Sequence, residues 1–195
     1  EVKFNSTSNS ALNRTVTFNL GAALPLSSNN HFYQFITAPN ISWTAAKTAA
    51  EQLTFFGKQG YLTTVTSAAE NQFIVSKIQG QGWMGAADSQ TEDNWKWMTG
   101  PEAGTQFWQG RSNGSVVGGL YNNWASGEPN DYGSGEDYAH FVIDGTWNDY
   151  PLSLGGIQGY VVEFGGLGND PCMVLSASKT VNVVVNVAPT NITLS

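Results

Sequence analysis

Apolar residues at helical spacing occupy two consecutive stretches in the first half of the chain. Ser42 can cap a helix over residues 43–56, which has a glycine just beyond its end. Ser67 and Glu70 form a capping-box pattern at the start of a second apolar stretch, residues 68–80, which ends on glycine. The pattern therefore predicts two helices, one soon after the other.

Short alternating runs, bounded by glycine, proline and asparagine, predict strands around these helices. The expected strands are residues 14–18, 31–36, 61–65, 83–85, 95–97, 138–143, 159–164 and 179–185. Residues 105–137 have no period and are predicted to form a long glycine-rich loop. Asn148-Asp149 is predicted to form the turn between the two late strands. Helices and strands together predict the α+β class.

The outer segments differ in character from the middle of the chain. We expect residues 1–28 to be an N-terminal extension with an edge strand, and residues 29–166 to form the main domain. Residues 167–195 are expected to contribute a strand and a linker to a following module. No internal repeat is apparent.

Composition narrows the classes of function. Of the 195 residues, 41% are hydrophobic and only 12% are charged, and the net charge is −7. So few basic residues cannot form a patch that neutralises phosphates, which excludes nucleic acid and disfavours an anionic membrane surface. No stretch is apolar enough to insert into a membrane. Cys172 is the single cysteine, so no disulfide within the chain can form.

The most informative residues are hard oxygen donors gathered in the second half. Carboxylates and amides occur among glycines, without helical period, at Glu128, Asn130, Glu136, Asn148 and Asp149. Ca²⁺ prefers such oxygen ligands and tolerates irregular geometry. The sequence therefore predicts a Ca²⁺ cage and indicates binding rather than catalysis.

These motifs, in this order, resemble the C-type lectin-like domain, specifically its Ca²⁺-dependent carbohydrate-recognition branch. The resemblance spans about His31 to Phe164 and is carried by Trp83-Met-Gly85, Glu128-Pro129-Asn130 and Trp147-Asn148-Asp149. It implies two helices, small antiparallel sheets and a long Ca²⁺-binding loop region. One departure is clear: Tyr138 and Val162 stand where the vertebrate family has cysteines, so this chain resembles a bacterial type without disulfides.

The resemblance also implies roles for the oxygen donors. The principal Ca²⁺ would be held by Glu128, Asn130, Glu136, Asn148 and Asp149, and the same side chains would hydrogen-bond two vicinal sugar hydroxyls. A cis peptide is expected before Pro129. Tyr132 is the candidate for an exposed ring that contacts the sugar.

A second, auxiliary Ca²⁺ site is implied at Asp88, Glu92 and Asp131. The alternative is that the acids of this loop are solvated surface residues. Five tryptophans invite a sugar-stacking interpretation, but their strand positions favour core packing. His31 and His140 are expected to be structural.

In the resembled family, a Glu-Pro-Asn order accompanies binding of mannose, glucose, N-acetylglucosamine and fucose, with galactose weaker. We therefore expect an extracellular, cell-surface adhesin module that binds such glycans with Ca²⁺ as cofactor. Residues 186–194 resemble junctions between adhesin modules, so neighbouring modules are expected. Ca²⁺ affinity should fall as pH drops towards about 4 to 5, where carboxylates become protonated.

Two other classes of function stay open at this point. A lectin-like fold can bind protein, peptide or ice instead of sugar, because fold alone does not settle function. A glycosidase would use Glu128 and Glu136 as its acid and base. Metal ligation explains both carboxylates more simply, and no nucleophile–base arrangement is apparent, so we do not expect an enzyme.

Overall fold

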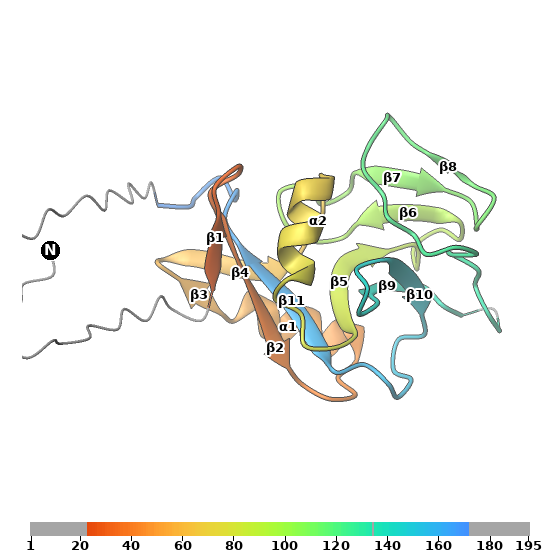
Figure 1. Ribbon diagram of the computed structural model, residues 1–195, viewed down its shortest axis with the longest axis horizontal. Coiled ribbons are helices and arrows are strands. Elements are labelled where there is room, and N and C mark those ends of the chain that lie inside the picture. Colours follow the sequence, from red (N-terminus) through yellow and green to blue (C-terminus); the bar gives the residue numbers. More distant parts are fainter. Residues whose placement is uncertain (1–22, 134, 172–195) are drawn as a thin grey trace, which may run out of the picture. The chain divides into compact units, whose positions relative to one another are not determined.

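Two antiparallel strands, β2 (His31–Thr37) and β11 (Gly159–Phe164), run through the centre of the computed structural model (Figure 1). The structure describes residues 23–133 and 135–171. The strands expected at 14–18 and 179–185, Cys172 and the linker at 186–194 lie outside the described residues. Pairing of Phe32 with Phe164 joins the start of the domain to its end.

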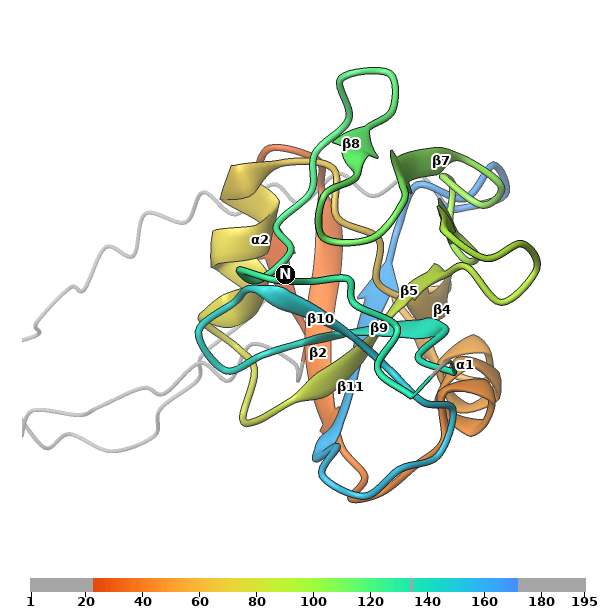
Figure 2. The same ribbon diagram turned by 90° about the vertical axis from the view of Figure 1, so that its right-hand side faces the viewer.

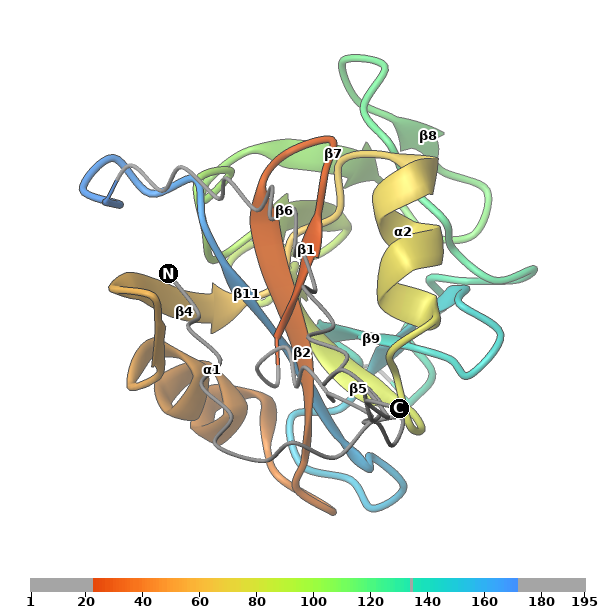
Figure 3. The same cartoon turned by 60° about the vertical axis from the view of Figure 1, so that its left-hand side comes forward.

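The helices lie on either side of this central pair of strands, as Figures 2 and 3 show from two directions. Helix α1 spans Trp43–Glu51 and helix α2 spans Ala68–Val75. The α+β class with two helices is confirmed for the part of the chain that the structure describes. None of the described helices is long and apolar enough to cross a membrane.

The remaining strands extend from both edges of the central pair. β1 (Leu24–Leu26) pairs with β2, and the hairpin of β3 (Thr54–Phe55) and β4 (Lys58–Leu62) joins β11 through β4. On the other side, β5 (Gly82–Ala87) lies parallel to β11, the one parallel pairing among the described strands. β6 (Asn94–Trp97), β7 (Gln106–Gln109) and β8 (Ser115–Val116) follow it in antiparallel order.

Both helices start where expected and end earlier. Ser42 Oγ accepts the Ala45 N–H and Ser67 Oγ accepts the Glu70 N–H, as N-caps do. The first helix was expected to reach residue 56. Instead Phe56 and Gly57 both adopt positive φ angles, 51° and 76°, and form the turn of the β3–β4 hairpin.

The second helix was expected to run to Gly80, but it stops at Val75. Ser76 Oγ donates to the Phe73 carbonyl at 2.6 Å and competes there with helical bonding. Its capping box is also only half formed. The Glu70 carboxylate accepts the Thr66 N–H at 2.7 Å rather than the N–H of the cap residue.

Two predictions in the second half of the domain were wrong. Residues 105–137 contain strands β7 and β8 rather than loop alone. Asn148-Asp149 forms part of strand β10 (Trp147–Tyr150), which pairs with β9 (Tyr138–Phe141). The turn between them is closed by the Val142 N–H donating to the Thr146 carbonyl at 2.8 Å.

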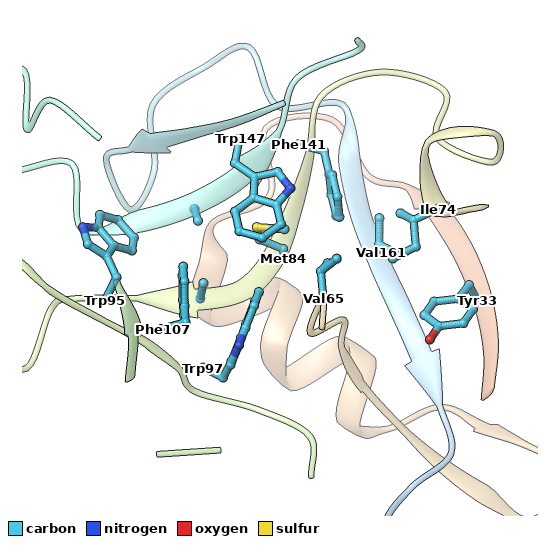
Figure 4. Close-up of a cluster of buried hydrophobic side chains, with 12 residues drawn as sticks. Tyr33, Val65, Ile74, Met84, Trp95, Trp97, Phe107, Phe141, Trp147 and Val161 are labelled. Atoms are coloured by element: carbon cyan, nitrogen blue, oxygen red, sulfur yellow. The ribbon is translucent and has the colours of Figure 1, made fainter. Parts of the chain in front are cut away.

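The core is rich in aromatic side chains that come mostly from the strands, with Ile74 contributed by α2 (Figure 4). Trp83, Trp95, Trp97 and Trp147 are fully buried, so the expectation that most tryptophans pack internally is confirmed. Trp97 stacks on Phe107 with ring centroids 4.5 Å apart.

Core packing also occupies Tyr138 and Val162, the two positions where the resembled vertebrate family has cysteines. Val162 is fully buried, and Tyr138 lies against Trp43 with ring centroids 4.9 Å apart. These contacts stabilise the fold without a covalent cross-link.

A buried polar network joins β2, β11 and α2. The Glu163 carboxylate lies 2.6 Å from His31 Nδ1 and accepts from Thr63 Oγ1 at 2.9 Å. The Tyr33 hydroxyl lies between Glu163 and Glu70, at 3.2 and 2.5 Å. His31 therefore has a specific structural role as a hydrogen-bond partner of a buried carboxylate, and, against the lowering effect of burial, the contact with Glu163 raises the pKa of His31.

Candidate functional site: an oxygen-rich loop held by strand β10

The Asp149 carboxylate ties the loop that carries the Glu-Pro-Asn motif to strand β10. Asp149 is fully buried, and its Oδ2 accepts the backbone N–H of Asn130 at 2.9 Å and that of Asp131 at 2.7 Å. Strand β10 is itself fixed by Trp147, whose Nε1 donates to Asn71 Oδ1 of α2 at 2.9 Å. The loop's position is thus set from the core outwards.

Glu128 and Asn130 lie together at the end of this loop. The Glu128–Pro129 peptide is cis, as the sequence predicts. Asn130 Nδ2 donates to Glu128 Oε2 at 2.5 Å. The amide nitrogen of Asn130 is therefore used within the pair, and its amide oxygen is directed elsewhere.

Glu136 closes the opposite side of the loop. Its Oε2 accepts the Tyr132 N–H at 2.9 Å, and its own N–H donates to Asp131 Oδ1 at 3.3 Å. The backbone N–H groups of Tyr132 and Glu136 are thus each bound by a carboxylate of the same segment. Tyr132 is 81% exposed, so its ring projects into solvent beside the carboxylates.

His140 fixes the orientation of the Asn148 amide. The two residues are cross-strand partners in the β9–β10 pair, with His140 Nε2 3.2 Å from Asn148 Nδ2. His140 Nδ1 lies 3.0 Å from the Phe141 carbonyl, which can only accept, so Nδ1 carries the proton and Nε2 accepts from Asn148. Asn148 Nδ2 also donates to the Asp149 carbonyl at 2.6 Å. The amide oxygen, Asn148 Oδ1, is therefore the atom that remains available to coordinate a metal ion.

The carboxylates of this loop crowd one another electrostatically. Burial raises the pKa of Glu128 to about 7, and the neighbouring Asp149 and Glu136 act in the same direction. Burial also raises the pKa of Glu136, with Asp149 and Asp131 adding to the effect and the Tyr132 N–H opposing it. A cation placed here would reverse these shifts.

The donor set fits a hard divalent cation. Within the described residues, Asp149 Oδ1 is a buried oxygen with no hydrogen-bond partner, which a metal ligand bond would satisfy. Every candidate donor is an oxygen, from carboxylates or amides, as Ca²⁺ prefers. In residues 23–133 and 135–171, no three His, Cys, Asp or Glu side chains are grouped as a ready metal site.

The expected auxiliary acids lie next to this loop and have a partner that the sequence did not reveal. Arg111 Nη2 is 2.8 Å from Asp131 Oδ2 and 3.7 Å from Glu92 Oε1. Asp88 is 4% exposed, and its Oδ1 lacks a partner among the described residues. Burial raises the pKa of Asp88 to about 7, and the charges of nearby acids contribute. The structure thus brings Asp88, Glu92 and Asp131 into one acidic region that contains an arginine.

Comparison with known proteins identifies similar sequences and similar folds. Residues 40–153 match the family model described as the lectin C-type domain. Halomucin of Haloquadratum walsbyi is 37% identical over 156 residues, which are 79% of this chain and 2% of halomucin. Hepatic lectin of Gallus gallus is 27% identical over 116 residues, which are 59% of this chain and 47% of that lectin. The chain thus spans only part of each relative.

Among solved structures, the C-type carbohydrate-recognition domain of cow CD23, determined in the presence of a GlcNAc2Man3 oligosaccharide, has a similar fold. The TM-score is 0.58 at 23% identity, with 78% of this chain and 100% of that chain covered. At this level of identity the likeness establishes the fold.

Proposed function

The chain belongs to the C-type lectin domain family, and from that premise we propose that it binds carbohydrate through a Ca²⁺ ion. The proposed ligands of this ion are Glu128, Asn130, Glu136, Asn148 and Asp149. The observation that carries the proposal is the buried Asp149 carboxylate, which holds the loop of Glu128 and Asn130 against β10 while one of its own oxygens lacks a partner. One oxygen of this carboxylate can thus hold the loop while the other coordinates the ion.

When bound, the Ca²⁺ would supply open coordination positions for two vicinal sugar hydroxyls. The protein would complete the hydrogen bonds of those hydroxyls, because each hydroxyl both donates and accepts. Glu128 and Glu136 offer acceptors, and Asn130 Nδ2 offers the N–H that it does not donate to Glu128. Both N–H groups of Asn148 already donate within the protein, to His140 and to the Asp149 carbonyl, so Asn148 would exchange one of these bonds to donate to a sugar hydroxyl. His140 keeps Asn148 Oδ1 directed away from β9 by accepting from Asn148 Nδ2.

We propose glycans with mannose-type vicinal hydroxyls as ligands, namely mannose, fucose, glucose and N-acetylglucosamine, with galactose weaker. The Glu-Pro-Asn order supports this selectivity. Tyr132 is proposed as an additional contact, because its ring is exposed at the rim of the same loop. The role is binding and not catalysis, which agrees with the matched family.

An extracellular, cell-surface adhesin context is part of the proposal. Its support is the 37% identity to halomucin, of which the matched region is only 2%. The matched region in that protein is thus one small part of a very long chain. We infer that this domain likewise acts beside other modules.

The test is binding to a glycan panel in Ca²⁺ and again in chelator. The expected result is chelator-sensitive binding to the mannose-type sugars and its recovery when Ca²⁺ is restored. Glu128→Gln should abolish binding, whereas Glu51→Gln makes the same chemical change on α1 and should leave it intact. Binding that persists in chelator would refute the Ca²⁺ mechanism. A folded domain that binds no sugar in Ca²⁺ would redirect the search to protein, peptide or ice.

A further inference from the structure

Backbone hydrogen bonds fix the loop that carries Arg111. Arg111 lies in the short loop between β7 and β8, where the Gly114 N–H donates to the Arg111 carbonyl at 2.7 Å. The preceding residue, Gly110, donates its N–H to the Asp93 carbonyl at 2.7 Å. These bonds attach the loop to the acidic segment at Asp93 and fix the backbone of Arg111 beside it.

The Arg111 guanidinium lies among three carboxylates. Its Nη2 is 2.8 Å from Asp131 Oδ2 and 3.7 Å from Glu92 Oε1, and its Nε is 3.4 Å from Asp93 Oδ1. The Asp131 side chain is 9% exposed and the Arg111 side chain is 47% exposed, so solvent screens this contact only from the arginine side. Two of the three acids expected to bind an auxiliary Ca²⁺ are therefore already paired with a positive charge.

The third acid, Asp88, has a carboxylate oxygen that the Arg111 guanidinium does not reach. Asp88 Oδ2 accepts the Asp93 N–H at 3.0 Å, whereas Asp88 Oδ1 is buried without a partner among the described residues. A Ca²⁺ entering beside Asp88 would meet the positive charge of Arg111 at the shared ligands Glu92 and Asp131. Like charges at such short range repel, so ion and guanidinium exclude each other.

We propose that Arg111 is a tethered cation that takes the place of an auxiliary Ca²⁺ at Asp88, Glu92 and Asp131. The auxiliary ion then binds only at Ca²⁺ concentrations well above those that fill the principal site. In its absence Arg111 holds Asp131, which in turn accepts the Glu136 N–H. The loop next to the principal site is thereby ordered without a second metal. The inference rests on the proposed function only in treating the principal ion as the first to bind.

The test is calorimetric titration of the domain with Ca²⁺ alone, which reads stoichiometry and affinity without any sugar. Arg111→Gln is expected to tighten binding of a second ion by about tenfold. Arg111→Lys keeps the charge and should behave like the wild type. Lys47→Gln removes one positive charge at a distant ion pair on α1 and controls for net charge.

The second ion is assigned by adding Asp88→Asn to Arg111→Gln, which should remove that ion and leave the first. An unchanged titration in Arg111→Gln, or an equal gain in Lys47→Gln, would overturn the inference. So would two ions of similar affinity in the wild type. If no protein, wild type or variant, binds an ion at the principal site, the proposed function is refuted. The effect of Arg111→Gln on the ion at Asp88, Glu92 and Asp131 would still decide the role of Arg111.

Discussion

At the residue scale, the structure shows how few side chains set the geometry of the site. Asp149 holds two backbone N–H groups with one oxygen and leaves the other free. Asn148 is oriented by His140, which is not among the proposed ligands of the ion. Partners of this kind orient metal ligands and are often as important as the ligands themselves.

His140 is the positioning residue whose effect is easiest to isolate. Burial lowers its pKa to about 4, so it stays neutral near pH 7 and its Nε2 keeps accepting from Asn148. We predict that His140→Ala weakens Ca²⁺ binding by about 10- to 100-fold. Calorimetry measures the affinity, and near-ultraviolet circular dichroism checks that the aromatic core is intact. Unaltered affinity in a folded variant would assign His140 a packing role only.

The pair Glu128 and Asn130 should determine which sugar is preferred. Exchanging them as Glu128→Gln with Asn130→Asp reverses the order of acceptor and donor around the proposed ion. We predict a shift of preference from mannose towards galactose, with Ca²⁺ binding retained because both new side chains still present oxygens. Competition by free sugars gives the ratio. An unchanged ratio would contradict the assignment of these residues to the sugar.

At the element scale, strand β5 is placed by close backbone contact. A Cβ added to Gly85 would clash with Thr99 Oγ1 and lie 2.6 Å from the Leu62 carbonyl. We predict that Gly85→Ala lowers the free energy of unfolding by about 1 to 3 kcal/mol through overpacking. Denaturant titration measures the loss. Gly155→Ala is the matched control, because the same methyl group there meets only Asn40 Oδ1 at 3.6 Å.

The elements also show what sequence patterns can and cannot predict. Both helix starts were predicted, because a capping serine acts on a backbone N–H only three residues away. The end of α1 was not, because the Phe56-Gly57 turn forms by pairing with β4. The β9–β10 turn did have a local signal, Asp144-Gly145, which is a strong hairpin sequence.

The candidate site likewise contains residues that the sequence predicts and residues that only the fold reveals. The motif residues could be found from their order along the chain, and the structure brings Glu128, Asn130 and Asp149 together. Arg111 could not be found, since it contacts Glu92 and Asp131 only through folding of the β7–β8 loop. His140 was expected to be structural, but its specific partner Asn148 could not be predicted, because Asn148 was placed in a turn instead of in the strand opposite.

At the scale of the whole molecule, a site that binds two hydroxyls is shallow and weak. An affinity on the order of 1 mM corresponds to about −4 kcal/mol. Many copies on one surface would raise the effective affinity without new contacts. This is why the proposed adhesin context matters for the function.

Without Ca²⁺, the whole domain should lose stability as pH rises. The folded-state pKa values of Glu128 and Asp88 are raised to about 7, and burial raises that of Glu136 as well. The folded protein therefore binds more protons than the unfolded chain. Stability from these groups is present at low pH and is lost as pH rises through about 7. His140 has the opposite effect on the free energy of unfolding. Its pKa is lowered in the folded protein, so the unfolded chain binds its proton first and stability is lost as pH falls below about 6.5.

We therefore predict that the melting temperature in chelator falls as pH rises from about 5 to about 7, between the unfolded and folded pKa values of these carboxylates, and that saturating Ca²⁺ removes this fall. At a free Ca²⁺ concentration of about 100 times Kd, the ion should add about 2.7 kcal/mol to the free energy of unfolding. The raised pKa values also place proton competition for Ca²⁺ nearer pH 7 than the range of about 4 to 5 expected from unperturbed carboxylates. Thermal melts across pH, with and without Ca²⁺, measure both effects. Equal pH profiles in the two conditions would show that these carboxylates do not bind the ion.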